Sequence, residues 1–400
     1  MASPLQQLES PRLSDFSAIP ESPAFVYSTA DLVDDASLIR GIAAETGCSL
    51  LYSVKACEVG AVLGVLVPYL DGFATSSLFE ARLARRVQGS DGEVHLTTPG
   101  LRAEEVDELV GLCDYVSMNS LGQLARYGQT VAARASCGLR VNPGLSYVED
   151  DRYDPGRRHS KLGVGIDELV AAERVSSGAL RDVDGLHVHV NCDSDDLSEL
   201  LETVRRLDAR LGPMLSRMEW VNLGGGYIFG DVESIDPFYE AVGLLRSKYD
   251  LRVIIEPGAA MVRRAGYLVS SVLDLFESDG KQIAVLDSTV NHMPEVFEYQ
   301  FQPDLLGADE DGSNGYILAG CSCLAGDVFG EYSFTEPLEV GSQVVFENVG
   351  AYALSKAHMF NGINLPSVYV IKGDGQVTLA SRSTEDEFFA RNGVGTGAAV

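Results

Sequence analysis

Residues 49–56 read SLLYSVKA, a short apolar run that ends near a lysine. A buried strand normally carries another aliphatic side chain at the place of Lys55. A lysine at the mouth of a strand can lose part of its hydration, so that its pKa falls and its amine becomes a nucleophile able to form a Schiff base with an aldehyde cofactor. A lysine at a strand edge can also lay its stem along apolar surface and keep its charge in water. This segment alone leaves both roles of Lys55 open.

Further runs of strand character follow this segment, with helix-compatible stretches between them. Together with the first run they cover residues 49–56, 71–77, 93–99, 114–120, 135–143, 185–191, 220–226 and 252–258. Intervening segments place apolar residues at helical spacing, as in 77–87, 103–112 and 197–211. Eight such alternations over roughly 230 residues are typical of a parallel (β/α)8 barrel, and a doubly wound open sheet is the alternative. We expect an α/β fold with a TIM barrel over residues 30–265.

Polar and reactive side chains gather at the ends of these runs. The active sites of such barrels lie at the C-terminal ends of the strands, so the barrel interpretation predicts a functional rim there. Turns alone would place Gly, Asp and Asn at strand ends, but they give no reason for Lys, Arg, His and Glu to share one rim. The residues at or just past the strand ends are Lys55, Ser76, Ser77, Asn119, Arg140, Asn142, His189, Asn191, Gly224, Gly225, Gly226 and Glu256.

The alternation stops near residue 266, and the rest of the chain is rich in strands. Candidate strands cover residues 266–276, 282–287, 315–319, 343–347 and 367–371. We expect a C-terminal β-domain over residues 266–400. A strand near Phe25, within residues 1–29, is expected to complete it.

Composition and charge narrow the function classes. The 400 residues are 46% hydrophobic, which describes a globular chain large enough for two domains, without a membrane span. The N-terminus lacks the basic start and apolar core of a signal peptide, so the cytoplasm is the expected compartment. A net charge of −28 argues against nucleic acid as a partner. The seven cysteines include no CxxC pair and no zinc-like cluster, so neither a disulfide framework nor a metal is expected.

Three motifs on the predicted rim each allow more than one role. The glycines at 224–226 let backbone amides approach an anion such as a phosphate, or simply form a tight turn. His187 and His189 share one face of a strand, where they could bind a metal, stack on a planar cofactor or be hydrogen-bonded in the core, and the metal role lacks a third ligand. Glu256 follows an apolar strand and needs a partner, which could be the ring nitrogen of pyridoxal phosphate or an arginine.

A further motif lies in the expected β-domain, where residues 320–327 read GCSCLAGD. Thiols in such a loop are often only small buried hydrophobes. The acid at Asp327 and the glycine-rich backbone favour a site instead.

Several ordered segments of the chain resemble one family. They read YSVKA at 52–56, ATSSLFEAR at 74–82, LHVHVNC at 186–192, WVNLGGGY at 220–227, HMP at 292–294, CLAGD at 323–327 and MFNG at 359–362. In these segments the chain is similar to the fold-type III pyridoxal phosphate decarboxylases, the alanine racemase-like group that includes ornithine and diaminopimelate decarboxylases. Within that group it resembles the carboxynorspermidine and carboxyspermidine decarboxylases most closely.

The resemblance implies a role for individual residues. Lys55 would hold pyridoxal phosphate covalently, His189 would stack on its ring and Glu256 would pair with the ring nitrogen. Cys323 would protonate the carbon that loses carbon dioxide, and Asp327 would bind a distal amine of the substrate. The phosphate would be bound by Gly224, Gly225, Gly226 and Tyr352. The remaining substrate-side residues would be Asp287, Glu295, Arg140 and Asn191.

The resemblance also implies an assembly and a reaction. In this family the loop equivalent to 320–327 reaches the barrel of a neighbouring subunit, so a homodimer with shared active sites is expected. The expected reaction removes the α-carboxylate of an amino acid with a cationic amine tail. The expected substrate is carboxynorspermidine or carboxyspermidine, in polyamine biosynthesis.

Two departures from the family pattern keep other substrates open. The loop begins Gly-Cys-Ser-Cys at 320–323 where the family generally has Gly-Pro-Thr-Cys, and Ala259 stands where relatives carry Glu or Arg. Lysine, ornithine, arginine, diaminopimelate or a specialised-metabolite precursor are the alternative substrates. An amino-acid racemase would need a second base facing Lys55, and a non-catalytic pyridoxal phosphate-binding protein would need neither Cys323 nor Asp327.

Overall fold

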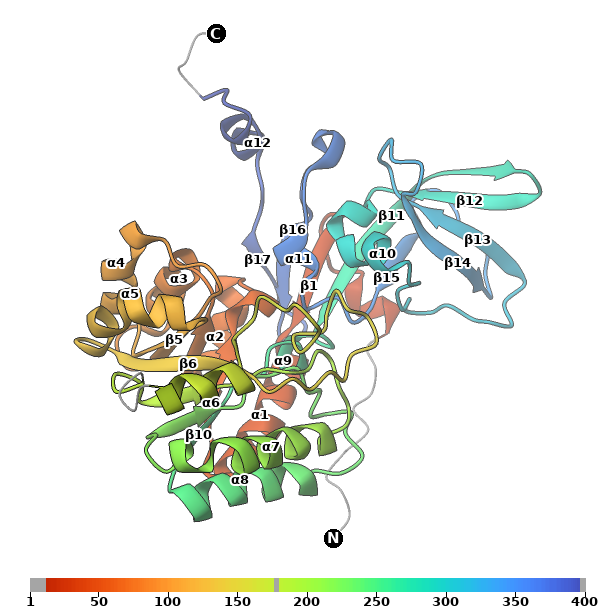
Figure 1. Cartoon of the computed structure of the whole chain (residues 1–400). Coiled ribbons are helices and arrows are strands. Elements are labelled where there is room, and N and C mark those ends of the chain that lie inside the picture. The colour runs from red at the N-terminus through yellow and green to blue at the C-terminus, as the bar shows by residue number, and fades with distance from the viewer. Residues whose placement is uncertain (1–11, 176–179, 396–400) are drawn as a thin grey trace. The chain divides into compact units, whose positions relative to one another are not determined.

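The computed structural model describes residues 12–175 and 180–395. The chain divides into two compact units (Figure 1). Residues 34–261 form the first, which we call the barrel unit. The segments up to residue 33 and from residue 262 onward form the second, the sheet unit. Within the described ranges, no helix combines the length and the apolar character that a bilayer crossing needs.

The barrel unit contains a closed ring of eight parallel strands. They are β2 (Ser49–Ser53), β3 (Gly72–Thr75), β4 (Glu93–Thr97), β5 (Tyr115–Met118), β6 (Ser136–Asn142), β8 (Gly185–His187), β9 (Trp220–Asn222) and β10 (Arg252–Ile255). Ring neighbours follow the chain order, and β10 pairs with β2 to close the ring. The two-residue strand β7 (Val164–Gly165) pairs with β6 beside the ring. The predicted TIM barrel is confirmed.

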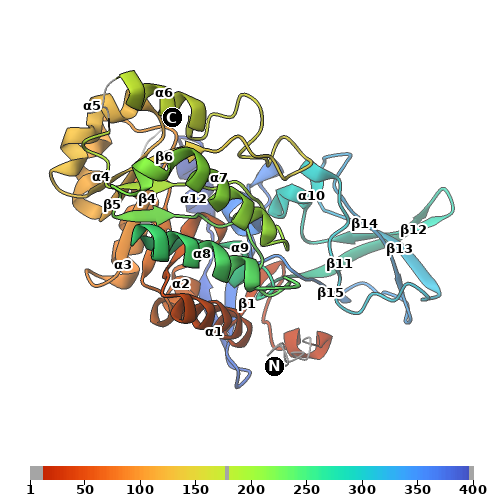
Figure 2. The same ribbon diagram turned by 60° about the horizontal axis from the view of Figure 1, so that its bottom comes forward.

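Helices separate the strands along the chain and pack outside the ring (Figure 2). They are α1 (Thr29–Thr46), α2 (Gly60–Leu66), α3 (Leu78–Gln88), α4 (Val106–Leu112), α5 (Leu121–Ala132), α6 (Ile166–Val175), α7 (Ser198–Leu215), α8 (Asp236–Tyr249) and α9 (Ala259–Val262). Contacts of α3 with β3 and β4, of α5 with β5 and β6, and of α8 with β10 fix these helices to the strands. Short 3-10 turns lie at η2 (Val54–Ala56), η3 (Val67–Tyr69) and η4 (Ala103–Glu105).

A single tryptophan fills part of the barrel interior. Trp220 is 2% exposed, packs with Leu51 and Ile254, and donates its indole N–H to the Ser136 hydroxyl at 2.9 Å. The indole fits because Gly185 faces it, since a Cβ on that glycine would lie 2.1 Å from the ring. Removing so large a buried side chain typically costs about 3–5 kcal/mol, so Trp220 is a main support of the ring beneath the rim.

The sheet unit is built from both ends of the chain. Its strands are β1 (Ala24–Ser28), β11 (Gly266–Ser278), β12 (Lys281–Leu286), β13 (Asn314–Ala319), β14 (Val328–Phe334), β15 (Gln343–Phe346), β16 (Ser367–Ile371) and β17 (Val377–Ser381). They follow the order β14-β13-β12-β11-β1-β16-β17, and β15 pairs with β11 off this path. β1 runs antiparallel to β11 and parallel to β16. The sequence did not predict β14 and β17.

Short helical segments precede, connect or follow these strands along the chain. They are η1 (Leu13–Phe16), η5 (Val290–His292), α10 (Pro294–Tyr299), α11 (Ala353–Lys356), η6 (Phe360–Gly362) and α12 (Glu385–Arg391). α12 begins at a capping box formed by Thr384 and Glu387.

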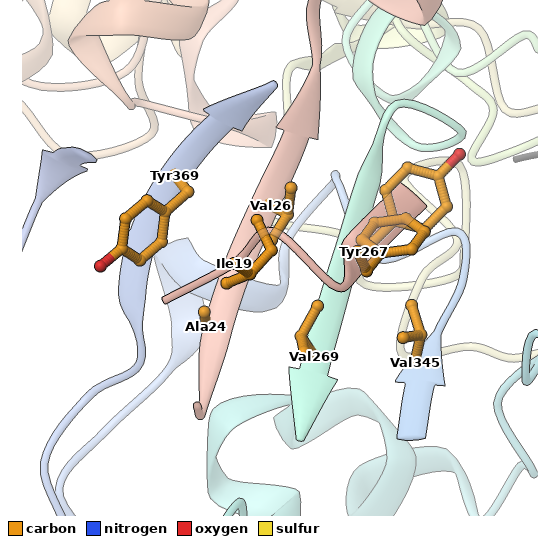
Figure 3. Packing of buried hydrophobic residues seen from close by; sticks show 8 residues of the cluster. Ile19, Ala24, Val26, Tyr267, Val269, Val345 and Tyr369 are labelled. Atoms are coloured by element: carbon orange, nitrogen blue, oxygen red, sulfur yellow. The ribbon is translucent and has the colours of Figure 1, made fainter. Parts of the chain in front are cut away.

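The core of the sheet unit lies on one face of its central strands. Figure 3 shows Ile19, Ala24, Val26, Tyr267, Val269, Val345 and Tyr369, which come from the segment before β1 and from β1, β11, β15 and β16. Phe16 belongs to the same cluster, and its ring centroid lies 4.8 Å from that of Tyr267. Each large side chain buried in this way contributes about 1.5–3 kcal/mol of transfer free energy, so this cluster joins the N-terminal segment firmly to the C-terminal strands.

Candidate active site

Lys55 lies in η2, directly after β2 at the C-terminal rim of the barrel. Its neighbours Val54 and Ala56 are buried, whereas the Lys55 side chain keeps accessible surface. The protein around the amine nevertheless desolvates it, and this lowers its pKa. The charge of Arg140 lowers the pKa further, while Glu256 opposes the shift. Lys55 is therefore accessible, and its amine gives up its proton more readily than the amine of a lysine in water, as an amine nucleophile requires.

Glu256 directly follows β10 and is 8% exposed. Asn222 donates a hydrogen bond from Nδ2 to Glu256 Oε1 at 2.6 Å. His95 Nδ1 lies 3.7 Å from the same oxygen, and His187 Nε2 lies 3.5 Å from Oε2. Burial alone would raise the pKa of Glu256, but the contact with His187, the charge of His95 and the bond from Asn222 outweigh it and hold that pKa below its usual range. Glu256 is thus a buried carboxylate that stays ionised.

The two histidines beside Glu256 are neutral near pH 7. Burial lowers the pKa of His95 to about 4, and burial also lowers the pKa of His187. His187 makes no hydrogen bond to the described residues through either ring nitrogen, so its approach to Glu256 is a contact and not a bond. The histidine charges therefore act on Glu256 only at lower pH, whereas near pH 7 the hydrogen bond from Asn222 and the positive charge of Arg140 favour its ionised state.

His189 lies two residues beyond the end of β8. Its Nδ1 accepts a hydrogen bond from the N–H of Gly225 at 3.0 Å, so a neutral His189 ring carries its proton on Nε2. Burial lowers the pKa of His189 well below its ordinary value, and Lys55 and Arg140 add to the shift. The ring is consequently neutral and held in one orientation. A neutral flat ring of this kind suits contact with another planar ring.

The glycine loop that follows β9 fits closely against neighbouring backbone. A Cβ on Gly224 would lie 2.6 Å from His189 Nδ1, one on Gly225 would lie 2.3 Å from the Glu256 carbonyl oxygen, and one on Gly226 would lie 2.1 Å from the Asn191 carbonyl oxygen. Gly224 and Gly226 also have positive φ angles of 68° and 93°. The N–H groups of Gly224 and Gly225 bond to Asn222 and His189. The tight-turn interpretation therefore holds, and phosphate binding by this loop stays a prediction.

Arg140 and Asn191 were predicted to contact the substrate. Arg140 lies on β6, and its burial lowers its pKa to about 10 although Glu256 opposes the shift. The amide of Asn191 is 1% exposed and donates to Glu199 at 2.6 Å. The Asn191 carbonyl lies against Gly226, so Asn191 supports the glycine loop. Arg140 instead belongs to the charged group around Lys55 and Glu256.

Other polar residues at the strand ends have structural roles. The Ser77 hydroxyl accepts the N–H of Glu80 and caps α3, and the Glu80 carboxylate accepts the N–H of Ser76. Asn119 accepts the N–H of Gly163 and donates to the carbonyl of Lys161. The predicted rim therefore contains both helix caps and a compact group of ionisable side chains.

The predicted residues Cys323 and Asp327 lie in the sheet unit, on the turn between β13 and β14. Cys323 is exposed, and its N–H donates to Asn361 Oδ1 at 2.8 Å. Asp327 is 3% exposed and accepts three hydrogen bonds, from the N–H of Val290 at 2.7 Å and from the N–H and hydroxyl of Ser322 at 2.9 and 2.5 Å. Asp327 therefore holds together the turn that carries Cys323.

The remaining predicted residues also lie in the sheet unit. Asp287 accepts hydrogen bonds from the Ser270 hydroxyl at 2.6 Å and from the Ser22 hydroxyl at 2.5 Å. Glu295 forms an ion pair with Lys356 at 2.6 Å. Tyr352 precedes α11 with a positive φ of 59°. Asp287 and Glu295 thus already have partners within their own unit.

Sequence reasoning missed two buried residues around Glu256. Asn222 was seen only within a longer motif, and His95 was not singled out at all, whereas His187 had been named together with His189. His95 lies inside β4 and is 0% exposed. A histidine between Val94 and Leu96 in a strand-like run was the available signal. Among the residues that the structure describes, no group of three His, Cys, Asp or Glu side chains is arranged to hold a metal ion.

Comparison with known proteins identifies the family. A sequence profile described as pyridoxal-dependent decarboxylase, pyridoxal binding domain, matches residues 40–263, which is more than half of the chain. The chain belongs to the pyridoxal-dependent decarboxylases. The profile spans β2 to β10 and therefore includes Lys55, His189 and Glu256 of this decarboxylase.

Individual relatives extend the match over nearly the whole decarboxylase. The carboxynorspermidine/carboxyspermidine decarboxylase of Herminiimonas arsenicoxydans is 32% identical over 369 residues, covering 92% of this chain and 98% of the relative. The carboxyaminopropylagmatine decarboxylase of Synechocystis sp. is 34% identical over 378 residues, covering 93% of this chain and 94% of the relative. The crystal structure of carboxynorspermidine decarboxylase from Campylobacter jejuni, in complex with norspermidine, matches with a TM-score of 0.82 and 27% identity over 93% of this chain and 100% of that chain. The predicted family and enzyme class are confirmed.

Proposed function

We propose that this decarboxylase removes the α-carboxylate of carboxynorspermidine or carboxyspermidine, with pyridoxal phosphate as its cofactor. One observation carries the chemistry, namely the accessible, desolvated amine of Lys55 on the same rim as the buried, ionised carboxylate of Glu256. The relatives from Herminiimonas arsenicoxydans and Campylobacter jejuni support the choice of substrate.

The residues of the barrel unit fit pyridoxal phosphate. Lys55 would hold it through the amine, Glu256 would meet the ring nitrogen, and the neutral ring of His189 would lie against its face. The glycine loop would bind the phosphate, and Tyr352 of the sheet unit is proposed to bind it as well. When bound, pyridoxal phosphate supplies an electron sink for the electron pair released as the carboxylate leaves. Because Glu256 is ionised, it can keep the ring nitrogen protonated, which is the state in which the sink is strongest.

The sheet unit would supply the proton and part of the substrate site. The exposed thiol of Cys323 is proposed to donate a proton to the carbon that has lost carbon dioxide. Asp327 has about four acceptor positions and uses three for donors of its own unit, namely Val290 and Ser322, so one remains for an N–H donor such as a distal amine of the substrate. Asp287 and Glu295 would add negative charge that attracts the cationic tail, and Arg140 and Asn191 would complete the barrel side.

A homodimer with shared sites is part of the proposal. Its support is the family resemblance of the turn at 320–327. Lys55→Ala and Cys323→Ala remove one function from each unit, so mixing the two inactive variants tests the sharing directly. If each site combines residues of two subunits, random reassociation restores about a quarter of the activity, because half of the dimers are mixed and each has one intact site. No recovery after verified subunit exchange would contradict shared sites.

A second candidate substrate is carboxyaminopropylagmatine. The Synechocystis relative that carries this name is 34% identical over 93% of this chain, so sequence similarity favours this substrate as well. Its tail ends in a guanidinium group, whereas the tails of carboxynorspermidine and carboxyspermidine end in an amine. The two candidates therefore differ in what the acidic residues must bind.

A competition assay decides between these substrates. The purified protein is loaded with pyridoxal phosphate, and mass spectrometry follows the loss of carbon dioxide from carboxynorspermidine, carboxyspermidine, carboxyaminopropylagmatine, lysine, ornithine, arginine and diaminopimelate. We expect the highest kcat/KM with carboxynorspermidine or carboxyspermidine. A higher value for carboxyaminopropylagmatine would replace the proposed substrate. A protein that yields no borohydride-trapped cofactor on Lys55 would refute the proposed cofactor.

A further inference from the structure

Beneath the rim, a chain of hydrogen bonds joins the glycine loop, Glu256 and the interior of the barrel. Its centre is Asn222, the last residue of β9, which is 0% exposed. Asn222 Oδ1 accepts the N–H of Gly224 at 2.8 Å. Asn222 Nδ2 donates to Glu256 Oε1 at 2.6 Å and lies 2.9 Å from His95 Nδ1. One side-chain amide therefore contacts both ends of the candidate cofactor site.

The donors and acceptors among these hydrogen-bonded groups allow only one placement of the Asn222 amide atoms and of the His95 proton. The N–H of Gly224 can only donate, so the Asn222 atom that faces it must be the amide oxygen. The amide nitrogen then provides one hydrogen to Glu256 and the other to His95, and His95 Nδ1 must be an acceptor. A neutral His95 consequently carries its proton on Nε2, which lies 2.8 Å from the Ser117 hydroxyl oxygen.

The surroundings of His95 support its neutral state. The His95 ring lies 5.2 Å from that of Trp220 and 5.5 Å from that of Tyr115, centroid to centroid. This enclosure removes water and lowers the pKa of His95 to about 4, although Glu256 acts in the opposite direction. A protonated His95 would lose its acceptor at Nδ1 and would turn a hydrogen toward the Asn222 amide, which has no lone pair to receive it.

We propose that Asn222 is a positioning residue that fixes Glu256 and the glycine loop relative to each other, and that His95 holds the Asn222 amide in the required orientation by accepting its second hydrogen. The consequence for catalysis rests on the proposed function. Glu256 would meet the ring nitrogen of pyridoxal phosphate, and the glycine loop would meet its phosphate. Asn222 then sets the spacing between the two groups that bind opposite ends of the cofactor.

Two substitutions at His95 separate hydrogen bonding from packing. His95→Gln keeps an acceptor for Asn222 and a donor for Ser117, whereas His95→Leu has a similar size and neither group. We expect His95→Leu to weaken binding of pyridoxal phosphate and to lower kcat by about tenfold to hundredfold, the size expected when one buried hydrogen bond near a charge is lost. His95→Gln should stay within about threefold of the unchanged protein, a difference of less than one such bond. Equal losses in both variants would overturn the proposal.

A second measurement needs no cofactor. Nitrogen-15 NMR of the histidine rings in the cofactor-free protein identifies which ring nitrogen carries the proton, with His95→Gln used to assign the His95 signals. We expect a neutral His95 with its proton on Nε2 at pH 7. A proton on Nδ1, or a doubly protonated ring at that pH, would overturn the proposal even if the enzyme is active. If the NMR result holds and the unchanged protein fails to bind pyridoxal phosphate, the proposed function fails while the hydrogen-bond arrangement stands.

Discussion

Gly225→Ala tests how tightly the glycine loop is fixed. Gly225 lies outside the left-handed region of φ, so an alanine can adopt its backbone conformation and only the new Cβ matters. That Cβ would lie 2.3 Å from the Glu256 carbonyl oxygen, whereas an ordinary contact begins at 3.4 Å. The loop or the end of β10 must therefore move by about 1.1 Å. The same movement disturbs the hydrogen bond from the Gly225 N–H to His189.

Both stability and activity should respond to this movement. Overpacking of a close contact costs about 1–3 kcal/mol. For a folded unit of this size the cost corresponds to a decrease in Tm of roughly 2–12 °C. A displacement of about 1 Å in a binding site can lower the rate about a hundredfold. We expect kcat/KM to fall by about that factor, because the loop positions both His189 and the end of the strand that carries Glu256.

The assay compares Gly225→Ala with Gly230→Ala. Gly230 follows in the same connection, but its Cβ would have no atom within 4 Å and its φ is not in the left-handed region. Thermal unfolding of the cofactor-free protein and carbon dioxide release by the loaded enzyme are measured for both. Gly230→Ala should resemble the unchanged protein in both. If Gly225→Ala kept its Tm and its kcat/KM, the loop would not be held rigidly against Glu256, and the reasoning from close contact would be wrong.

Further changes test other parts of the molecule. Cys323→Ala should lower kcat at least tenfold while the protein still binds pyridoxal phosphate, since general acid catalysis contributes about a hundredfold or more; an unchanged rate would remove the proposed proton donor. Trp220→Ala should lower the free energy of unfolding in urea by about 3–5 kcal/mol, and a change below about 1 kcal/mol would show that the barrel interior tolerates the cavity. Burial lowers the pKa of His292 from 6.5 to about 4 in the folded state, so its contribution to stability is complete above pH 6.5 and is lost as the pH falls toward 4. In His292→Leu the loss of unfolding free energy between pH 7.5 and 4.5 should be smaller by up to about 3 kcal/mol; an identical pH dependence would contradict this assignment.

The barrel could be predicted because its strands are short apolar runs that repeat with helical segments between them. The missed strands lack such a regular pattern. In β14 the buried residues Phe329 and Tyr332 are three positions apart, which does not match the period of two expected for a strand. The cause is a register shift against β13, where Leu318 pairs with Gly330 and Ala319 pairs with Val328. The bulge places Phe329 out of alternation, and a pattern search cannot anticipate it.

The residues of the candidate site were likewise predicted only in part. Lys55 and Glu256 were found because an ionisable residue at the end of an apolar strand is unusual in sequence. His95 was missed because it lies within its strand, and the carboxylate beside it is far away in the chain. The internal partners of Asp327 could not be predicted either, since two of its three donors are backbone N–H groups, which no residue type reveals. Contacts between distant segments can be found only once the fold is known, whereas ionisable residues at strand ends can be found from the sequence pattern alone.

The position of β1 has a consequence for the order in which the protein is made. Ala24 pairs with Val269 on one side of β1 and with Ser367 on the other, so a strand that is made before the barrel lies between two strands that are made after it. The whole barrel is synthesised before either partner exists. During that time the apolar segment AFVYS has both edges unpaired, and such an edge can pair with other chains. Nascent chains that end after residue 261 and before residue 266 should therefore contain the complete barrel unit and a β1 with both edges unpaired, which makes them clients for a chaperone that binds short extended apolar segments.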